Sequence, residues 1–213
     1  MTMHVSAPSD NDSEPAEKRR EPRSALAMMR AAKLICQTGE YLCLIRDVSA
    51  GGVKLRLFHE MPDETHVFME RADGELHALI RVWVRDNTAG FRFVQPVDPE
   101  DFMNRAAGTA ARSVRLRMPA PAVVHAHGRA MRGRLRDLAQ GGAQIEIDAC
   151  LPIGETVVLS VDRLGEQQGW IRWRRGQAHG IVFDVPRRLD QLAADALALQ
   201  PLAAKADRSR GVA

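Results

Sequence analysis

IRDVSAGGVKL, residues 45–55, runs from an apolar strand pattern into Asp-x-Ser-x-x-Gly and out again into an alternating strand pattern. The stretch returns ninety positions later as LRDLAQGGAQI, residues 135–145. Two further landmarks keep the same offset without a gap, because Trp83 corresponds to Trp173 and Gly90 to Gly180. The chain therefore contains two copies of one domain, each of about 90 residues, a size common among compact domains.

Both copies show the sequence pattern of short strands. In the first copy, Val53, Leu55 and Leu57 alternate with Lys54 and Arg56, which is the period-two pattern of a strand with one buried face. Six such segments follow one another at a spacing of about 8–12 residues, as in sandwiches and barrels. The second copy repeats the pattern between residues 114 and 185. The sequence predicts an all-β fold.

A short helix is expected after the strands of each copy. In the first, Pro99 precedes two acidic residues and is placed near the first helical position. In the second, residues 190–199 carry apolar residues close to helical spacing, with Asp190 as the expected cap. Gly108 and the two residues after it are expected to form a flexible joint between the copies.

The repeated tryptophans and glycines receive structural interpretations. Trp83 and Trp173 lie in alternating segments, so both are predicted to be core residues. Gly90 and Gly180 are predicted to be turn residues.

The cysteines indicate no site. Cys36, Cys43 and Cys150 have no metal-ligand spacing and are odd in number, which argues against a disulfide framework. We interpret them as small buried residues in a reducing compartment, with Cys36 and Cys43 able to face each other across a hairpin.

The composition limits the possible functions. Lys+Arg 30 against Asp+Glu 27 is nearly balanced, and three Trp with one Tyr make a broad stacking platform for single strands unlikely, so nucleic acid is an unlikely partner. No Gly-x-Ser-x-Gly, P-loop or dinucleotide-binding fingerprint occurs, and Ser49 has no evident base. His125 and His127 form a close pair with no third ligand nearby. We expect neither an enzyme nor a metal site.

The ends of the chain are polar. Residues 1–17 cannot offset the entropy of ordering and are predicted to form a disordered arm, and residues 201–213 a flexible tail. The arm lacks the apolar segment of a signal peptide, and no apolar run approaches the length of a membrane span, which predicts a cytoplasmic protein. A basic cluster follows at residues 18–23, where Arg19 and Arg23 would share one face of an extended segment.

Arg-x-x-x-Arg (Arg19, Arg23), followed 24 residues later by Asp-x-Ser-x-x-Gly (Asp47, Ser49, Gly52), resembles the motif pair of the PilZ domain family. The Trp…Gly-x-x-Phe segment that begins at Trp83 is also similar to the closing hairpin of that family. The resemblance implies two tandem six-stranded antiparallel β-barrels, each followed by a short helix. The first domain would span residues 18–107, and the second would span residues 108–200.

Many PilZ domains bind cyclic di-GMP, and the resemblance implies this ligand here, with no other cofactor. Arginine can fork to phosphate or to guanine O6/N7, a carboxylate can accept from guanine N–H groups, and glycines permit positive φ and close backbone approach. We expect a bacterial receptor that changes its arm and domain arrangement when the ligand binds. This change would signal to an unidentified partner protein. The expected ligand-binding residues are Arg19, Arg20, Arg23, Asp47, Ser49, Gly51 and Gly52.

The second copy departs from this pattern. Ala139 replaces Ser49, and the positions of Arg19 and Arg23 fall on Thr109 and Ser113. Arg112, Arg115 and Arg117 lie nearby at a different spacing. We expect a degenerate copy with a structural or partner-contacting role in preference to a second site.

Two other functions remain as alternatives. The chain could be a scaffold or interaction protein that uses the fold without a nucleotide. It could also bind RNA or DNA weakly through its arginines, with steep salt dependence and no preference for the dinucleotide.

Overall fold

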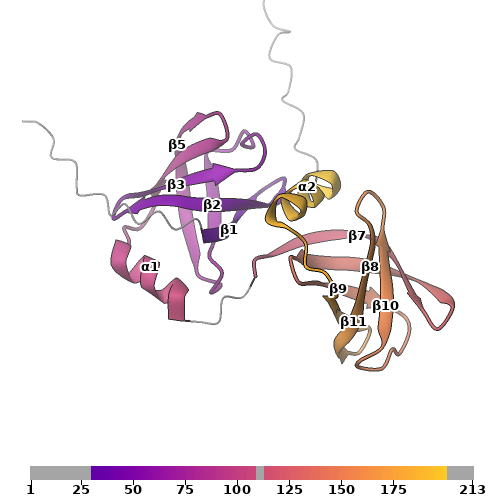
Figure 1. Ribbon diagram of the computed structural model, residues 1–213. Helices are drawn as coiled ribbons and strands as arrows, with labels where there is room; N and C mark the ends of the chain where they lie inside the picture. Colours follow the sequence, from indigo (N-terminus) through magenta and orange to yellow (C-terminus); the bar gives the residue numbers. More distant parts are fainter. Residues whose placement is uncertain (1–29, 109–112, 201–213) are drawn as a thin grey trace, which may run out of the picture.

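A computed structural model describes residues 30–108 and 113–200, apart from the side chains of residues 105–108. Each sequence repeat forms a closed antiparallel barrel of six strands followed by a short helix, as expected (Figure 1). The elements of the first barrel are β1 (Arg30–Cys36), β2 (Gly39–Ser49), β3 (Gly52–Leu57), β4 (His66–Glu70), β5 (Leu76–Arg85), β6 (Thr88–Phe93) and α1 (Pro99–Gly108). The elements of the second are β7 (Arg115–Ala126), β8 (Arg129–Ala139), β9 (Gly142–Ile147), β10 (Thr156–Val161), β11 (Gly165–Arg175), β12 (Ala178–Phe183) and α2 (Leu189–Leu199).

The two barrels have the same strand order. The first runs β1-β2-β3-β6-β5-β4 and closes by pairing β1 with β4, and the second runs β7-β8-β9-β12-β11-β10 and closes by pairing β7 with β10. Closure leaves no exposed sheet edge along the paired segments. The ninety-residue repeat in the sequence is therefore a repeat of topology.

The cores follow the period-two patterns. In β3, Val53, Leu55 and Leu57 are buried while Lys54 and Arg56 are exposed, as predicted. The long strand β7 alternates in the same way along its whole length. Each barrel thus fills its interior with one face of every strand, which leaves the loops and outer faces to carry function.

The two helices begin differently. Pro99 opens α1 as predicted, and the Asp98 carboxylate accepts hydrogen bonds from the backbone N–H groups of Glu100 (2.8 Å) and Asp101 (3.2 Å). The expected cap of α2 is wrong, because the N-cap is Arg188. Asp190 lies inside the first turn and accepts from the Arg188 guanidinium.

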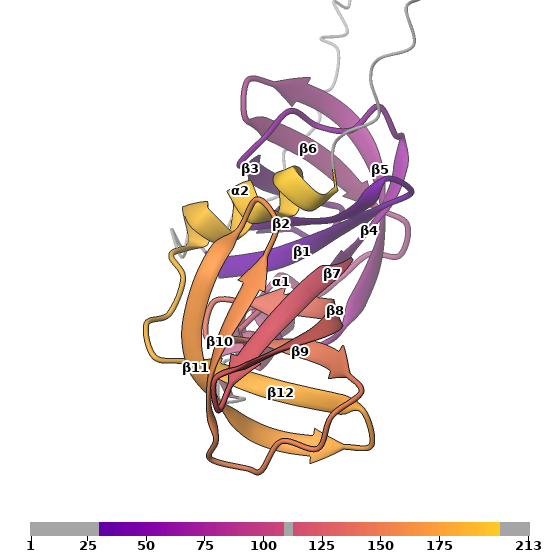
Figure 2. The same cartoon turned by 90° about the vertical axis from the view of Figure 1, so that its right-hand side faces the viewer.

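Helix α2 connects the barrels. It contacts β2 of the first barrel as well as β7 of its own, and Figure 2 shows it lying between the two. Leu42 of β2 is fully buried and packs in the hydrophobic cluster of the second barrel. The described parts of the two domains therefore share an apolar contact that the sequence repeat does not reveal.

The cysteine interpretation is partly wrong. Cys43 is buried and Cys36 half-buried, but Cys150 is exposed. Cys43 lies opposite Ala32 and Cys36 opposite Gly39, so the two do not face each other across the hairpin. All three thiols are free.

The described residues offer no group of three His, Cys, Asp or Glu side chains placed to hold a metal ion. None of the described helices has the length and apolar character needed to cross a membrane.

Candidate functional site

A cavity of about 260 Å³ opens on the first barrel between the β2–β3 and β5–β6 hairpins. The structure brings Asp47, Ser49 and Gly52 of the predicted motif together in its wall. Gly51, the remaining motif residue, precedes β3 and does not line the cavity. The other lining residues were not predicted to belong to a site, namely Val48, Val53, Lys54, Val82, Trp83, Gly90 and Phe91.

Two β-bulges shape the walls of this cavity. The β2–β3 register shifts between Ile45 and Asp47, and the β5–β6 register shifts between Arg81 and Trp83. An extra residue in one strand bends it locally and re-aims the side chains that follow. The second barrel has both bulges at the equivalent places, between Leu135 and Asp137 and between Ile171 and Trp173.

Asp47 lines this cavity and carries an unsatisfied acceptor. Its Oδ1 atom is buried and accepts no hydrogen bond from any described residue. A buried polar atom without a partner costs about 1–3 kcal/mol, so such atoms usually meet a donor from solvent or a ligand. Asp47 can therefore accept a hydrogen bond from an N–H group that enters the cavity.

Ser49 and Gly52 build the β2–β3 turn. The Ser49 hydroxyl donates to the Gly52 carbonyl oxygen at 3.3 Å. A Cβ atom on Gly52 would lie 2.6 Å from the carbonyl oxygen of Phe91 on β6, so glycine is required by the close approach of two strands. Neither Gly51 nor Gly52 uses the positive φ that glycine permits.

Trp83 was predicted to be a core residue, and the structure corrects this. Trp83 is 43% exposed, and it lines the cavity. Its partner across the ladder is Gly90, which lies within β6 and not in a turn, as Gly180 lies within β12. A Cβ on Gly90 would overlap the indole Nε1 and Cε2 atoms, so the ring rests directly on the glycine. The repeated Trp-x₆-Gly spacing was the sequence signal for this arrangement.

One described cation lies in the wall of this cavity. Lys54 Nζ is 5.9 Å from the centroid of the Trp83 ring, a cation–π contact. The predicted arginines, Arg19, Arg20 and Arg23, lie outside the described residues, as do the arm 1–17 and the tail 201–213. Their place at this cavity stays a prediction.

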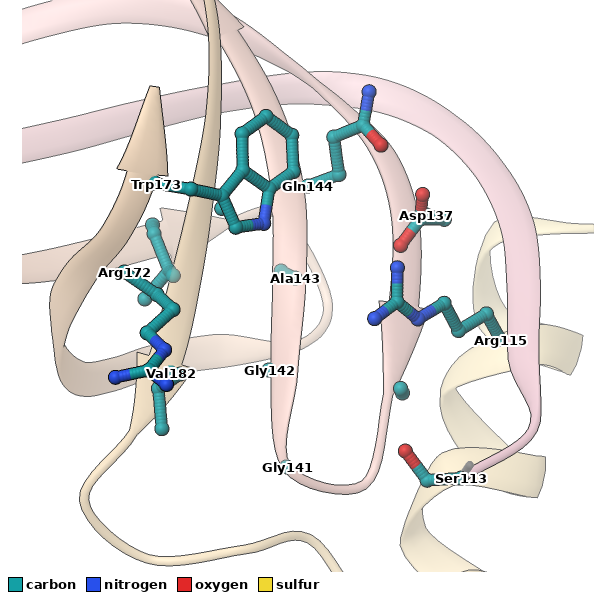
Figure 3. Close-up of a pocket in the computed structure, with 13 residues that line it drawn as sticks. Ser113, Arg115, Asp137, Gly141, Gly142, Ala143, Gln144, Arg172, Trp173 and Val182 are labelled. Carbon is teal, nitrogen blue, oxygen red and sulfur yellow. The ribbon is translucent and has the colours of Figure 1, made fainter. Parts of the chain in front are cut away.

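The second barrel has a cavity of about 240 Å³ at the equivalent place. Asp137, Gly142 and Trp173 line it, as Asp47, Gly52 and Trp83 line the first. Figure 3 shows Arg115, from the start of β7, with its guanidinium directed toward Asp137. Burial raises the pKa of the Asp137 carboxyl, and the Arg115 charge partly opposes that rise. Arg115 was visible in the sequence near the lost motif, but its spacing did not assign it to a site.

Comparison with protein families identifies both repeats. The model of the PilZ domain matches residues 17–106 and again residues 110–197, which together make up most of the chain. No curated protein sequence matches the chain.

Several solved structures match most of the chain at low identity. PlzA of Borreliella burgdorferi in complex with c-di-GMP has 14% identity and a TM-score of 0.34, and the match covers 80% of this chain and 88% of that one. MrkH of K. pneumonia in its c-di-GMP complex has 12% identity and a TM-score of 0.33, covering 80% and 86%. YcgR of Escherichia coli with c-di-GMP has 15% identity and a TM-score of 0.31, covering 79% and 82%. The family assignment rests on the two domain matches and not on these scores.

Proposed function

We propose, from the premise that this chain belongs to the PilZ domain family, that its first barrel binds cyclic di-GMP and makes the protein a receptor for that nucleotide. The family match covers the motif that lines the first cavity. The solved structures of PlzA, MrkH and YcgR with c-di-GMP name the same ligand for similar chains. The proposal concerns binding and signalling, and it assigns the chain no catalytic step.

The observation that carries this proposal is the orphaned Oδ1 atom of Asp47. A guanine base offers N–H donors on one edge, and such a donor would satisfy the buried carboxylate oxygen. The exposed ring of Trp83 supplies an aromatic surface in the wall of the same cavity, on which a purine can stack. An acceptor and a flat apolar surface in one cavity suit a guanine base.

The phosphates of the ligand need cations as well. Lys54 is a described cation of the cavity wall, and Arg19, Arg20 and Arg23 are proposed to supply the rest. A guanidinium can fork to two phosphate oxygens, with charged hydrogen bonds of about 1.5–3 kcal/mol. We expect the arginine segment to close over the bound nucleotide.

Closure of that segment would change the surface offered to a partner. Val82 and Val84 lie on β5 beside Trp83, and they are 64% and 44% exposed. An arm that packs over the cavity would cover or reshape this apolar strip. We propose that a downstream protein reads this change, which requires the ligand to bind the two arrangements with different affinity.

Isothermal titration of cyclic di-GMP into the full chain tests the proposal, with GTP as a competitor of related chemistry. We expect saturable binding to the native chain, and a loss of about tenfold or more in affinity for Asp47→Ala and for Arg19→Ala/Arg23→Ala. Asp162→Ala, which removes an exposed carboxylate of the second barrel, is the matched control and should bind normally.

Three outcomes would contradict parts of this scheme. No heat from a folded native chain would leave the scaffold alternative. Equal binding of GTP would remove the dinucleotide specificity. Binding that survives Asp47→Ala would move the ligand away from the first cavity.

A further inference from the structure

The cavity of the second barrel keeps the framework of the first and changes its chemistry. A shift of ninety residues aligns Ser49 with Ala139, Lys54 with Gln144 and Val82 with Arg172. The replacement residues all line the second cavity. The second copy therefore lost the motif hydroxyl and the Lys54 cation, and it gained an amide at Gln144 and a cation at Arg172 in the same wall.

Two arginines of the second barrel itself line this cavity. Arg115 comes from the first position of β7, and Arg172 comes from β11 at the bulge before Trp173. Figure 3 shows them on opposite sides of β9, the strand that carries Gly142 and Ala143. The cations here belong to described strands, so this cavity has its positive charges without an arm.

The guanidinium N–H groups of both arginines keep hydrogen-bonding capacity within the described part of the chain, although the Arg115 charge acts on Asp137. No hydrogen bond or ion pair joins Arg115 or Arg172 to another described residue, and Arg172 makes only a cation–π contact, with its Cζ atom 5.6 Å from the Trp170 ring. The other ionisable side chain in the wall is Asp137, so positive charge exceeds negative charge. Free donors and excess positive charge favour an anionic ligand.

Charges from both barrels act on Asp137. After burial, the largest effect on its pKa is the lowering by Arg115, and Glu40 raises it while Lys33 and Arg117 lower it. An anion bound at Arg115 would share that cation with Asp137. An anionic ligand should therefore bind more tightly when it also donates a hydrogen bond to the Asp137 carboxylate.

An aromatic surface completes the wall. Trp173 lies on Gly180 as Trp83 lies on Gly90, because a Cβ on Gly180 would overlap the indole Nε1 and Cε2 atoms. The Gln144 side chain, opposite Asp137 across the β8–β9 ladder, offers both a donor and an acceptor. A flat ring, an amide and a carboxylate are groups that recognise a purine base.

We propose that this cavity is a second binding site, for a phosphorylated purine, in which Arg115 and Arg172 hold phosphate and Trp173 and Asp137 contact the base. The site needs no arginine arm and goes beyond the receptor role of the first barrel. Ser113 and Arg115 also line a cavity of about 490 Å³ that reaches Lys33 and Arg71 of the first barrel. A ligand larger than a mononucleotide can extend into that space.

Without Trp83, tryptophan fluorescence reports on the second barrel. The chain has three tryptophans, and Trp83→Phe leaves only Trp170 and Trp173, both in the second barrel. The full chain carrying Trp83→Phe is titrated with GMP, cyclic di-GMP and inorganic phosphate, with excitation at the red edge of the indole band. We expect saturable quenching by at least one of the two nucleotides, and a much weaker response to phosphate.

Two variants in the Trp83→Phe chain test the assigned residues. Arg115→Ala and Arg172→Ala should each weaken the quenching ligand about tenfold or more, because each removes a charged donor. Arg175→Ala, an exposed arginine of β11 outside the cavity, is the matched control and should leave the affinity unchanged. Quenching that is absent, or equally affected by Arg175→Ala, would overturn the proposal. An equal response to phosphate would reduce it to an anion site and overturn the purine assignment.

Adding Asp47→Ala to the Trp83→Phe chain separates the two proposals. Quenching that persists in this double variant belongs to the second barrel, whether or not the first barrel binds cyclic di-GMP. Quenching that disappears came from the first barrel, and the second site is then rejected while the receptor role of the first stands.

Discussion

The side-chain amide of Gln200 pairs with both backbone groups of Glu40. The Glu40 N–H donates to Gln200 Oε1 at 2.9 Å, and Gln200 Nε2 donates to the Glu40 carbonyl oxygen at 3.2 Å. Gln200 directly follows α2, and Glu40 lies at the start of β2 in the other barrel. Gly39 makes room for this amide, because a Cβ there would overlap Gln200 Oε1. One side chain thus extends the hydrogen bonding of the first barrel to the helix of the second.

The Glu40 side chain strengthens the same junction. Its carboxylate accepts from the Arg117 backbone N–H of β7 at 2.8 Å and pairs with the buried ammonium of Lys33 at 3.1 Å. Lys33 also pairs with Glu70 at 2.9 Å. A buried charge destabilises the fold when its partner is removed. The stability of the junction therefore depends on β7 packing where it can contact Glu40.

Gln200→Ala should loosen the junction between the barrels. The change leaves the partly buried N–H and C=O groups of Glu40 without their partners, at a cost of about 1–3 kcal/mol. Small-angle scattering should show a larger radius of gyration than in the native chain. Gln167→Ala, which removes an exposed hydrogen bond to Val185 within the second barrel, should leave the radius unchanged.

Leu42→Ala should destabilise the chain and separate the barrels. Leu42 belongs to β2 of the first barrel but packs in the core cluster of the second, and its truncation should cost about 2–5 kcal/mol. Denaturant unfolding and small-angle scattering measure the two effects. Leu57→Ala, confined to the first core, should cost a similar amount without expanding the folded molecule. Equal scattering from both variants would show that Leu42 does not join the domains.

Gly90→Ala should displace Trp83 from its place on β6. The added methyl group would overlap the indole, and forced repacking of this kind costs about 1–3 kcal/mol. We expect a shift in tryptophan emission and weaker cyclic di-GMP binding together. Gly51→Ala serves as the stability control, since a Cβ there meets nothing within 4 Å. Unchanged emission from Gly90→Ala would argue against the ring position described here.

Asp137→Asn should raise stability at neutral pH. Burial, the largest effect, raises the pKa of Asp137 above its ordinary value, so the folded state favours the protonated carboxyl. The stability that this group contributes is present below the unfolded pKa and is lost as pH rises through the folded pKa. Removing the charge avoids that loss.

Thermal unfolding between about pH 4 and neutral pH measures this effect. The melting temperature of Asp137→Asn should exceed that of the native chain at neutral pH, and the difference should shrink toward pH 4. Asp148→Asn, an exposed carboxylate near the end of β9, is the control and should show no such trend. A difference that is the same at every pH would mean that the carboxylate charge is not its cause.

The fold was predictable because its signals are local and repeated. The strands β3 and β7 alternate between buried and exposed residues, and both copies keep the same order of landmarks. These patterns can be read from nearby residues without knowing which strands pair. The barrel topology came from the family resemblance and is confirmed by the strand order.

The position of Trp83 was not predictable from alternation. Counting by twos from buried Leu79 places Trp83 on the inner face, but the register shift between Arg81 and Trp83 turns it outward. A single inserted residue reverses the face of every side chain that follows. Trp173 follows the same kind of shift.

Part of the wall of the first cavity was predicted, and the role of those residues in ligand binding stays a prediction. Asp47, Ser49 and Gly52 were found because a short motif keeps them on one turn. Lys54, Trp83 and Arg115 were missed as site residues because their places depend on which strands become neighbours.

The sequence by itself determined that the chain is a tandem repeat of one β domain, and it determined where the motif turn lies. Both follow from the spacing of residues that are close together in the chain. Only the tertiary structure decided which face the tryptophans occupy, that Arg115 and Arg172 line one cavity, and that Gln200 reaches Glu40. Those relations arise from bulges, barrel closure and the packing of α2 against β2, which bring together residues far apart in the chain.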